Sequence, residues 1–209
     1  MEGTEQLRIF NIFGEEGYTM AEQITRVKRE LIHKGAILDI YKDTMELPNG
    51  KTEEWDFVSH RKGAAAVVPV TADGKVLMVR QYRPSLERET LEIPAGARDS
   101  VTEDTKVTAA RELEEETGYY SADIDFLISL KTTVAFCDEF VDIYLARNLV
   151  KTEQHLDDAE DIAVEAWDLE DLCDMIYKGR MQDAKTVAAI LAYKNLKNVN
   201  VDDYCPGRA

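Results

Sequence analysis

Residues 105–118 read Thr-Lys-Val-Thr-Ala-Ala-Arg-Glu-Leu-Glu-Glu-Glu-Thr-Gly, and this stretch carries most of the information about the fold. Val107, Ala110 and Leu113 recur at a spacing of three, which predicts an amphipathic helix with these side chains on its apolar face. Gly118 is the expected end of the helix, because glycine adopts the left-handed backbone that terminates helices without strain. A helix that stops at this glycine is therefore the central element of the predicted fold.

The predicted helix carries carboxylates on one side. On an ideal helix Glu112, Glu115 and Glu116 fall within an arc of about 100°, whereas Glu114 points the opposite way. Like charges three and four residues apart destabilise a helix by roughly a few tenths of a kcal/mol per pair, and a cation bound among them reverses that cost. Carboxylate oxygens are the ligands that Mg²⁺ and Mn²⁺ prefer. An acidic run is more often a solvated surface, so the helix alone leaves both interpretations open.

Strands are predicted on both sides of this helix. They are residues 36–41, 45–47, 55–58, 64–70, 75–82, 124–130, 141–146 and 162–167. The strands 64–70 and 75–82 are expected to pair as a hairpin across the Ala72-Asp73-Gly74 turn. Asp168 and Asp183 are the predicted N-caps of two later helices. A mixed sheet flanked by helices is the natural assembly of these elements.

Composition narrows the classes of partner. The 209 residues include 41 acidic and 25 basic ones, for a net charge of −16. Such a chain repels a phosphate backbone, so no nucleic-acid partner is expected. No apolar run is long enough to cross a bilayer and the N-terminus lacks the pattern of a secretory signal, so we expect no membrane association and a cytoplasmic location. Cys137, Cys173 and Cys205 are far apart and predict neither a disulfide framework nor a zinc site.

The residues around the helix match a known motif. Gly96, Glu103, Arg111-Glu112-Leu113, Glu115-Glu116 and Gly118-Tyr119 resemble the Nudix box, G-x5-E-x7-R-E-U-x-E-E-x-G-U, in which U is aliphatic or aromatic. The spacing agrees from Glu103 onward, but six residues rather than five separate Gly96 from Glu103. A one-residue insertion in the loop explains this departure and leaves the helix in register.

The resemblance implies an α+β fold, the α/β/α Nudix sandwich with a mixed β-sheet, plus a small N-terminal antiparallel β-sheet domain. The implied divisions are residues 1–60 for an N-terminal β-rich region of dimerisation and substrate contact, 61–198 for the Nudix hydrolase domain, and 199–209 for a tail. The chain is accordingly expected to form a homodimer.

The resemblance also implies roles for the residues of the box. Glu112, Glu115 and Glu116 would bind the metal ion, Mg²⁺ or alternatively Mn²⁺, and Glu115 and Glu116 would thereby take part in catalysis. The carbonyl of Ala95 would complete one metal site. The structural residues of the box would be Gly96, Glu103, Arg111 and Gly118. The implied chemistry is attack of water on one phosphorus of a substrate X–O–P–O–P–Y.

The flanks of the box look like the ADP-ribose pyrophosphatase branch of the family. The similar segments are Val79-Arg80-Gln81-Tyr82-Arg83-Pro84, the Thr90–Gly96 stretch and residues 176–186. By resemblance Arg83 would contact phosphate, Glu92 would assist at the site and Glu139 would contact a ribose. The implied reaction is Mg²⁺-dependent hydrolysis of ADP-ribose to AMP and ribose 5-phosphate.

Two alternatives stay open at this point. Val134 stands where the branch often has a proline, so hydrolysis of GDP-mannose or another nucleotide sugar is the alternative reaction. A Nudix-fold module that senses a nucleotide without cleaving it is the alternative of another class, which the intact glutamates of the box disfavour.

Two site residues are predicted outside the box. The general base is expected in the acidic stretch 155–161, with Glu160 as the first candidate and Asp161 as the second. Trp55 is predicted either to pack in the core or, as in the homodimers of this branch, to stack on the adenine of the substrate.

Overall fold

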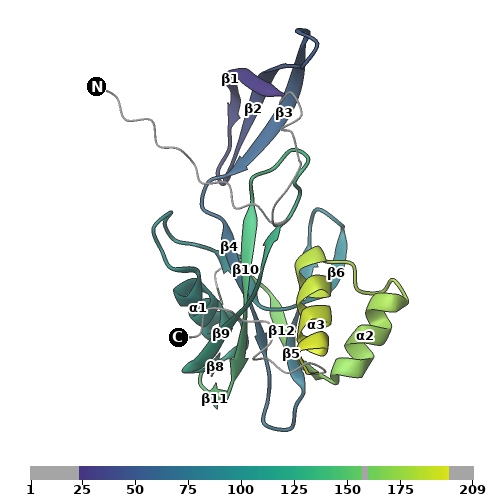
Figure 1. The fold of residues 1–209 in the computed structure, drawn as a ribbon. Helices are drawn as coiled ribbons and strands as arrows, with labels where there is room; N and C mark the ends of the chain where they lie inside the picture. The colour runs from purple at the N-terminus through teal and green to yellow at the C-terminus, as the bar shows by residue number, and fades with distance from the viewer. Residues whose placement is uncertain (1–23, 157–159, 198–209) are drawn as a thin grey trace, which may run out of the picture.

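The computed structural model describes residues 24–156 and 160–197 (Figure 1). Its strands are β1 (Thr25–Lys34), β2 (Leu38–Glu46), β3 (Thr52–His60), β4 (Ala64–Pro69), β5 (Val76–Arg83), β6 (Arg88–Glu92), β7 (Ala95–Ala97), β8 (Tyr119–Tyr120), β9 (Asp123–Lys131), β10 (Phe140–Arg147), β11 (Val150–Lys151) and β12 (Ile162–Trp167). Its helices are α1 (Thr105–Thr117), α2 (Leu169–Tyr177) and α3 (Ala184–Leu196). The predicted tail 199–209, Cys205 and residues 157–159 lie outside the described residues.

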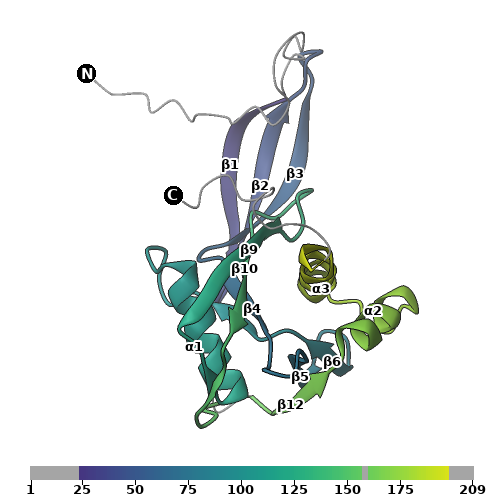
Figure 2. The ribbon, with the colours of Figure 1, turned by 60° about the horizontal axis from the view of Figure 1, so that its bottom comes forward.

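The central body is layered. A four-stranded sheet in the order β7-β4-β10-β9 is mixed, because β4 and β10 run parallel while the other pairs are antiparallel. A second sheet has the order β12-β5-β6. Helix α1 lies on one side of β4 and β10, and α2 and α3 lie on the other (Figures 1 and 2). The predicted α+β class with a mixed sheet is confirmed.

The first three strands form a separate antiparallel sheet in the order β1-β2-β3. It projects from the body as an arm (Figure 1). The sequence did not predict β1, because its residues Thr-Arg-Val-Lys-Arg-Glu-Leu-Ile-His-Lys lack the alternation of a half-buried strand and nine of the ten are exposed. Pairing with β2 along its length defines β1 instead.

The predicted hairpin of residues 64–70 and 75–82 is wrong. Both strands form and a turn joins them, but β4 and β5 enter different sheets and share only the isolated bridge between Val70 and Val76. The two edges of β4 are already occupied by β10 and β7, and those of β5 by β12 and β6. Each strand therefore satisfies its backbone groups without the other.

Helix α1 spans Thr105–Thr117, as predicted, and Gly118 ends it at a φ of 68°. Its predicted apolar face is confirmed at Leu113, which is fully buried, and at Ala110, which packs against the core, but it is wrong at Val107, which is 57% exposed. The buried side consists of Thr105, Thr108, Ala109, Glu112, Leu113, Glu116 and Thr117. Ala109 and Leu113 join the core against β4, β9 and β10, and this contact turns two glutamates inward on the same side.

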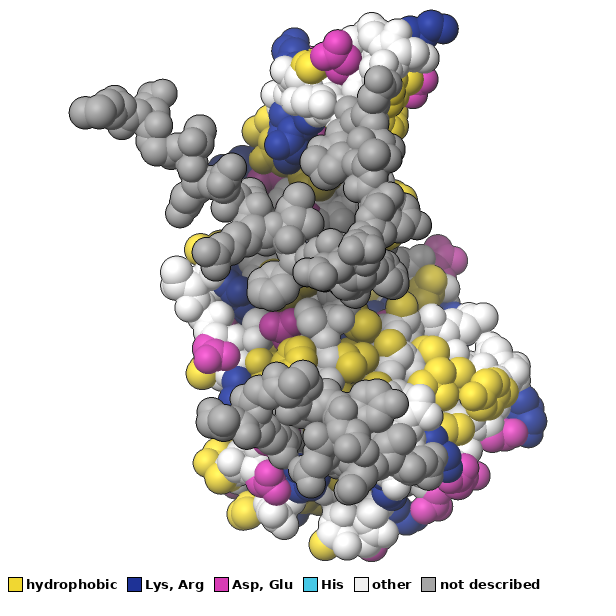
Figure 3. Space-filling model, viewed as in Figure 1, with side chains coloured by type: hydrophobic (Ala, Val, Ile, Leu, Met, Phe, Trp, Pro, Cys, Tyr) yellow, Lys and Arg dark blue, Asp and Glu magenta, His cyan; other side chains and the backbone are white. Residues whose placement is uncertain are grey.

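A larger apolar core lies between the sheets and the helices α2 and α3. On the face shown in Figure 3, hydrophobic side chains gather beside these two helices, while charged side chains follow the outer edge of the body. Asp183 caps α3 as predicted, with its side chain accepting from the backbone N–H of Thr186 at 3.0 Å. Asp168 occupies the N-cap position of α2 without a side-chain capping bond. Within the described residues, no helix combines the length and the apolar character that crossing a membrane requires.

Candidate active site

Helix α1 brings three carboxylates towards the loop that contains β7. Glu116 is 2% exposed and Glu112 is 7% exposed, whereas the Glu115 side chain is partly open to solvent. The backbone N–H of Ala95 donates to Glu116 Oε2 at 3.0 Å, which ties the helix to the loop. The side of α1 that faces the protein is therefore acidic at the point where the loop crosses it.

Arg111 holds this arrangement together. Its Nη1 donates to Glu112 Oε1 at 2.7 Å and to Glu115 Oε2 at 2.9 Å, and its Nη2 donates to the carbonyl of Ala97 at 3.1 Å. Glu103 Oε2 accepts from the backbone N–H of Asp99 at 2.5 Å and lies near the same guanidinium. Both side chains connect the loop to the helix, and a structural role is what the box motif implies for them.

The charges of the two buried glutamates are only partly compensated, by Arg111 for Glu112 and by the backbone N–H of Ala95 for Glu116. Burial raises the pKa of Glu112 to about 7 and the pKa of Glu116 to about 8. Repulsion from Glu112 raises the pKa of Glu116 further, although the hydrogen bond from Ala95 and the charge of Lys185 act in the opposite direction. A bound cation would stabilise the ionised form of both carboxylates.

The donor set suits a hard divalent cation. Among residues 24–156 and 160–197, no three His, Cys, Asp or Glu side chains lie close enough together to hold a metal ion as they stand. The reason is local, since the guanidinium of Arg111 bridges Glu112 and Glu115 while Glu116 turns to the backbone of Ala95. Carboxylate oxygens are nevertheless the ligands that Mg²⁺ and Mn²⁺ prefer, and here they are buried on one side of a helix with too little positive charge nearby to neutralise them.

Gly96 leaves room for the carboxylate of Glu112. A Cβ at this position would overlap the carboxylate carbon and both oxygens of Glu112. Because these atoms end a flexible side chain, Gly96→Ala is expected to displace the carboxylate rather than the backbone. We therefore expect turnover to fall by about 10- to 100-fold while the free energy of unfolding changes by less than about 1 kcal/mol. Steady-state kinetics and thermal denaturation measure the two quantities.

The matched control is Gly74→Ala, in the turn between β4 and β5. Gly74 has a φ of 83° and open space around its Cα. An alanine there is expected to lower stability by roughly 1 kcal/mol through backbone strain and to leave turnover unchanged. If Gly96→Ala lost stability but kept full activity, the proposed displacement of Glu112 would be wrong.

Three cavities adjoin one another through shared lining residues, and the acidic helix lines the first of them. The first, of about 270 Å³, is lined by Glu112, Glu115, Glu160 and their neighbours. The second, of about 430 Å³, shares residues 95–97 with the first. The third and largest, of about 710 Å³, shares Glu139, Asp183 and Lys185 with the second but is lined by none of the box glutamates. These three adjoining cavities are together called the cleft.

The far end of this cleft contains a charge cluster around Glu92. Arg83 Nε and Nη2 each donate to a different Glu92 oxygen at 2.7 Å, and Lys185 Nζ donates to Glu92 Oε2. Burial would raise the pKa of Glu92, but these bonds and the charge of Lys185 outweigh it and lower the pKa to about 2. The cluster therefore keeps the carboxylate of Glu92 ionised beside Arg83 and Lys185 in the wall of the cleft.

Of the other predicted site residues, Glu139 and Glu160 line the cleft and Trp55 does not. Glu139 lines both larger cavities, and its Oε2 accepts from Thr132 Oγ1 at 2.8 Å. Glu160 lines the smallest cavity beside Glu112 and Glu115. Trp55 is 41% exposed in β3, on the arm, and lines none of the three cavities.

Several residues of the cleft were not predicted to line it. Among them are His60, Lys62, Asp183 and Lys185. The segment Asp183-Ala184-Lys185-Thr186 had been noted as similar to the branch, which was the available signal for the last two. The first two lie where the arm joins the body, and nothing local in the sequence marks that junction.

Comparison with known proteins gives a consistent result. The profile of the family described as the NUDIX domain matches residues 60–190. The chain is 40% identical over 173 residues to an ADP-ribose pyrophosphatase of Bacillus subtilis (strain 168), covering 82% of this chain and 92% of the relative. It is 41% identical over 166 residues to the methanol dehydrogenase activator of Bacillus methanolicus, covering 78% and 89%. A crystal structure of an ADP compounds hydrolase matches its fold with a TM-score of 0.76 at 22% identity, covering 84% of this chain and 95% of that one.

Proposed function

The chain belongs to the Nudix family of hydrolases, and we propose that it hydrolyses the diphosphate bond of ADP-ribose to give AMP and ribose 5-phosphate. The observation that carries this proposal is the series of adjoining cavities whose lining includes both the acidic helix and the cations Arg83 and Lys185. A diphosphate needs cationic partners in a chain of net charge −16, and this cleft contains them.

Enzymes of this family depend on a divalent metal ion, and we propose Mg²⁺, with Mn²⁺ as the alternative. Glu112, Glu115 and Glu116 would hold it, with the carbonyl of Ala95 as a further ligand. When bound, such an ion neutralises phosphate oxygens and lowers the pKa of a coordinated water molecule. Arg111 would have to release Glu112 and Glu115, since its guanidinium bridges them in the present arrangement.

The protein side chains would divide the remaining work. Glu160 would accept a proton from the water molecule whose oxygen attacks phosphorus, while the bond from that phosphorus to the bridging oxygen breaks. Arg83 would bind a phosphate oxygen, with three of its five N–H donors left after the bidentate pair with Glu92. Glu139 would accept a hydrogen bond from a hydroxyl of the ribose.

The arm and the assembly complete the proposal. Residues 1–60 would form the region of dimerisation and substrate contact, and residues 61–198 the hydrolase domain. In a homodimer Trp55 would reach the substrate of the partner protomer and stack on its adenine, using a ring that is half exposed in one protomer. A cytoplasmic location is part of the same proposal.

A substrate panel tests the reaction. The purified protein is incubated with ADP-ribose, GDP-mannose and other nucleoside diphosphate sugars, each with Mg²⁺ or Mn²⁺, and the products are separated. We expect AMP and ribose 5-phosphate from ADP-ribose at the highest kcat/KM. Preference for GDP-mannose would support the alternative reaction, and binding without turnover of any compound would support the nucleotide-sensing module.

A further inference from the structure

We infer that Lys185 is a substrate-binding residue that contacts a phosphate oxygen beside Arg83, and that Glu92 acts as a positioning residue for both cations. The inference rests on the proposed function, because it requires a diphosphate in the cleft. It changes the role expected for Glu92, which the sequence placed among the substrate-binding residues.

Glu92 has no capacity left for a substrate. Its side chain is 3% exposed, and both carboxylate oxygens are engaged. Oε1 accepts from Arg83 Nε at 2.7 Å and from Thr90 Oγ1 at 2.6 Å, while Oε2 accepts from Arg83 Nη2 at 2.7 Å and from Lys185 Nζ. The carboxylate thus fixes where the two cations lie and contacts the reaction only through them.

Lys185 lies where the two larger cavities meet. It lines both of them, whereas Arg83 lines only the larger. Its ammonium donates to Glu92 and, at 2.9 Å, to Asp183 Oδ2. An ammonium has three N–H donors, so one is left for a ligand in the cleft.

Hydrogen bonds connect the start of α3 to the residues between β6 and β7, which precede α1. The backbone N–H of Ile93 donates to Thr186 Oγ1 at 3.0 Å, and Asp183 caps the helix by accepting from the N–H of Thr186 at 3.0 Å. Ile93 precedes Ala95, whose N–H binds Glu116. A short series of hydrogen bonds therefore places Lys185 relative to α1.

The charges along the cleft match those of a diphosphate. Arg83 lines the largest cavity and Lys185 lines the two larger ones, so both cations border the space in which a diphosphate would lie. A diphosphate carries one negative charge on each phosphate. Two adjacent cations, together with a carboxylate helix suited to a metal ion, match that charge distribution.

The competing interpretation is that Lys185 only neutralises buried Glu92. In that case its removal would lower stability and leave substrate affinity unchanged. Lys185→Ala separates the two roles. We expect the KM for ADP-ribose to rise by about 10- to 100-fold, as for the loss of one charge-assisted hydrogen bond, with kcat changed by less than about threefold.

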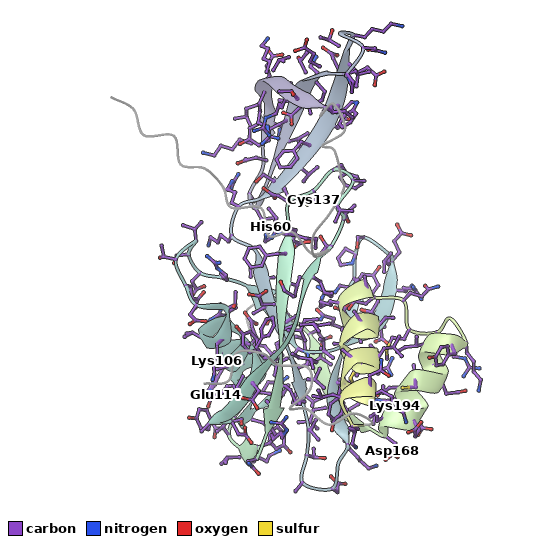
Figure 4. All side chains as sticks on the ribbon, viewed as in Figure 1. His60, Lys106, Glu114, Cys137, Asp168 and Lys194 are labelled. Atoms are coloured by element: carbon purple, nitrogen blue, oxygen red, sulfur yellow. The ribbon has the colours of Figure 1, made fainter. Side chains whose placement is uncertain are left out.

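Two variants accompany this one. Lys185→Arg keeps the charge and is expected to return KM to within about threefold of the unmodified protein. Lys194→Ala is the matched control, because Lys194 is on the same helix, also pairs with a glutamate, Glu170, and lies at the other end of the body from His60 of the cleft (Figure 4). It removes the same charge and should leave KM unchanged. Thermal denaturation is measured for all three.

Glu92→Gln tests the positioning role. It is expected to raise KM in the same direction, and Lys185→Ala is expected to raise KM by less in the Glu92→Gln background than in the unmodified protein, because Glu92 acts through Lys185. Fully additive effects, or an unchanged KM in Lys185→Ala, would overturn the inference while leaving the proposed reaction intact.

Binding of inorganic pyrophosphate in the presence of Mg²⁺ provides a readout that does not depend on turnover. Calorimetry should show weaker binding to Lys185→Ala than to Lys194→Ala by about 10-fold or more. If the unmodified protein cleaves no nucleotide sugar, the proposed function fails, and this comparison still decides whether Lys185 binds a diphosphate. Equal affinities for the two variants would contradict the inference.

Discussion

Glu116→Gln is expected to reduce kcat by about 1000-fold or more while leaving the fold intact, because it removes a charged metal ligand. Glu116 is the most deeply buried of the three box carboxylates on α1. Glutamine has nearly the same shape and keeps an oxygen that can accept from the backbone N–H of Ala95. Steady-state kinetics on ADP-ribose with saturating Mg²⁺ measures the loss.

The same substitution should stabilise the metal-free protein at high pH. Burial raises the pKa of Glu116 to about 8, well above its value in the unfolded chain. A carboxyl with a raised pKa contributes stability at pH values below the unfolded pKa, and this contribution is lost as the pH rises through about 8. The unmodified metal-free protein should therefore lose thermal stability between pH 5 and pH 9 relative to Glu116→Gln, and Mg²⁺ should restore it only in the unmodified protein.

Glu114→Gln is the matched control. Glu114 is on the same helix, is only partly buried and lines none of the three cavities of the cleft. It removes the same charge at nearly the same place in the sequence, and we expect kcat and the pH dependence of stability to be unchanged. Retained turnover in Glu116→Gln would argue against the metal-binding role of the helix.

Glu160→Gln is expected to lower kcat by about 100- to 10 000-fold, which is the usual contribution of a general base. Glu160 lines the cavity that Glu112 and Glu115 also line, and its charge raises the pKa of both Glu112 and Glu116. These relations place it beside the predicted metal ligands. The substitution leaves substrate contacts in place, so KM should change little.

The control for Glu160 is its neighbour, the second candidate from the sequence. Asp161 does not line the cavity of Glu112 and Glu115. Asp161→Asn should therefore retain nearly full activity. The reverse outcome, with Asp161→Asn inactive and Glu160→Gln active, would transfer the role of the base to Asp161. The kcat of the active variants would then be measured against pH. A fall in kcat at low pH would show that the general base is still present.

The helix, its ends and its motif could be predicted from the sequence because they depend on residues close together in the chain. The three-and-four spacing of Glu112, Glu115 and Glu116 sets their common side, and the conformational freedom of Gly118 sets the end of α1. The strands 124–130, 141–146 and 162–167 could also be found from local composition, within one or two residues of β9, β10 and β12.

Strand pairing and burial were decided by tertiary structure. β4 and β5 follow one another through a turn that favours a hairpin, but each completes its hydrogen bonds with strands distant in sequence, β10 and β12. Val107 fits a helical apolar pattern, yet the contact of Ala109 and Leu113 with the sheet turns it outward. No local spacing contains that information, because it depends on which edges and faces remain free after the other elements have packed.

The active site shows the same difference between what local sequence determines and what tertiary structure decides. The sequence by itself determined which carboxylates share one side of α1, since a helix places residues by their separation alone. Only the tertiary structure decided that Glu92 is buried beneath Arg83 and Lys185, which are 9 and 93 residues away along the chain. The physical reason is that a buried carboxylate is stable only beside compensating cations. Tertiary packing determines which cations lie beside it, and the spacing of residues along the sequence does not reveal this.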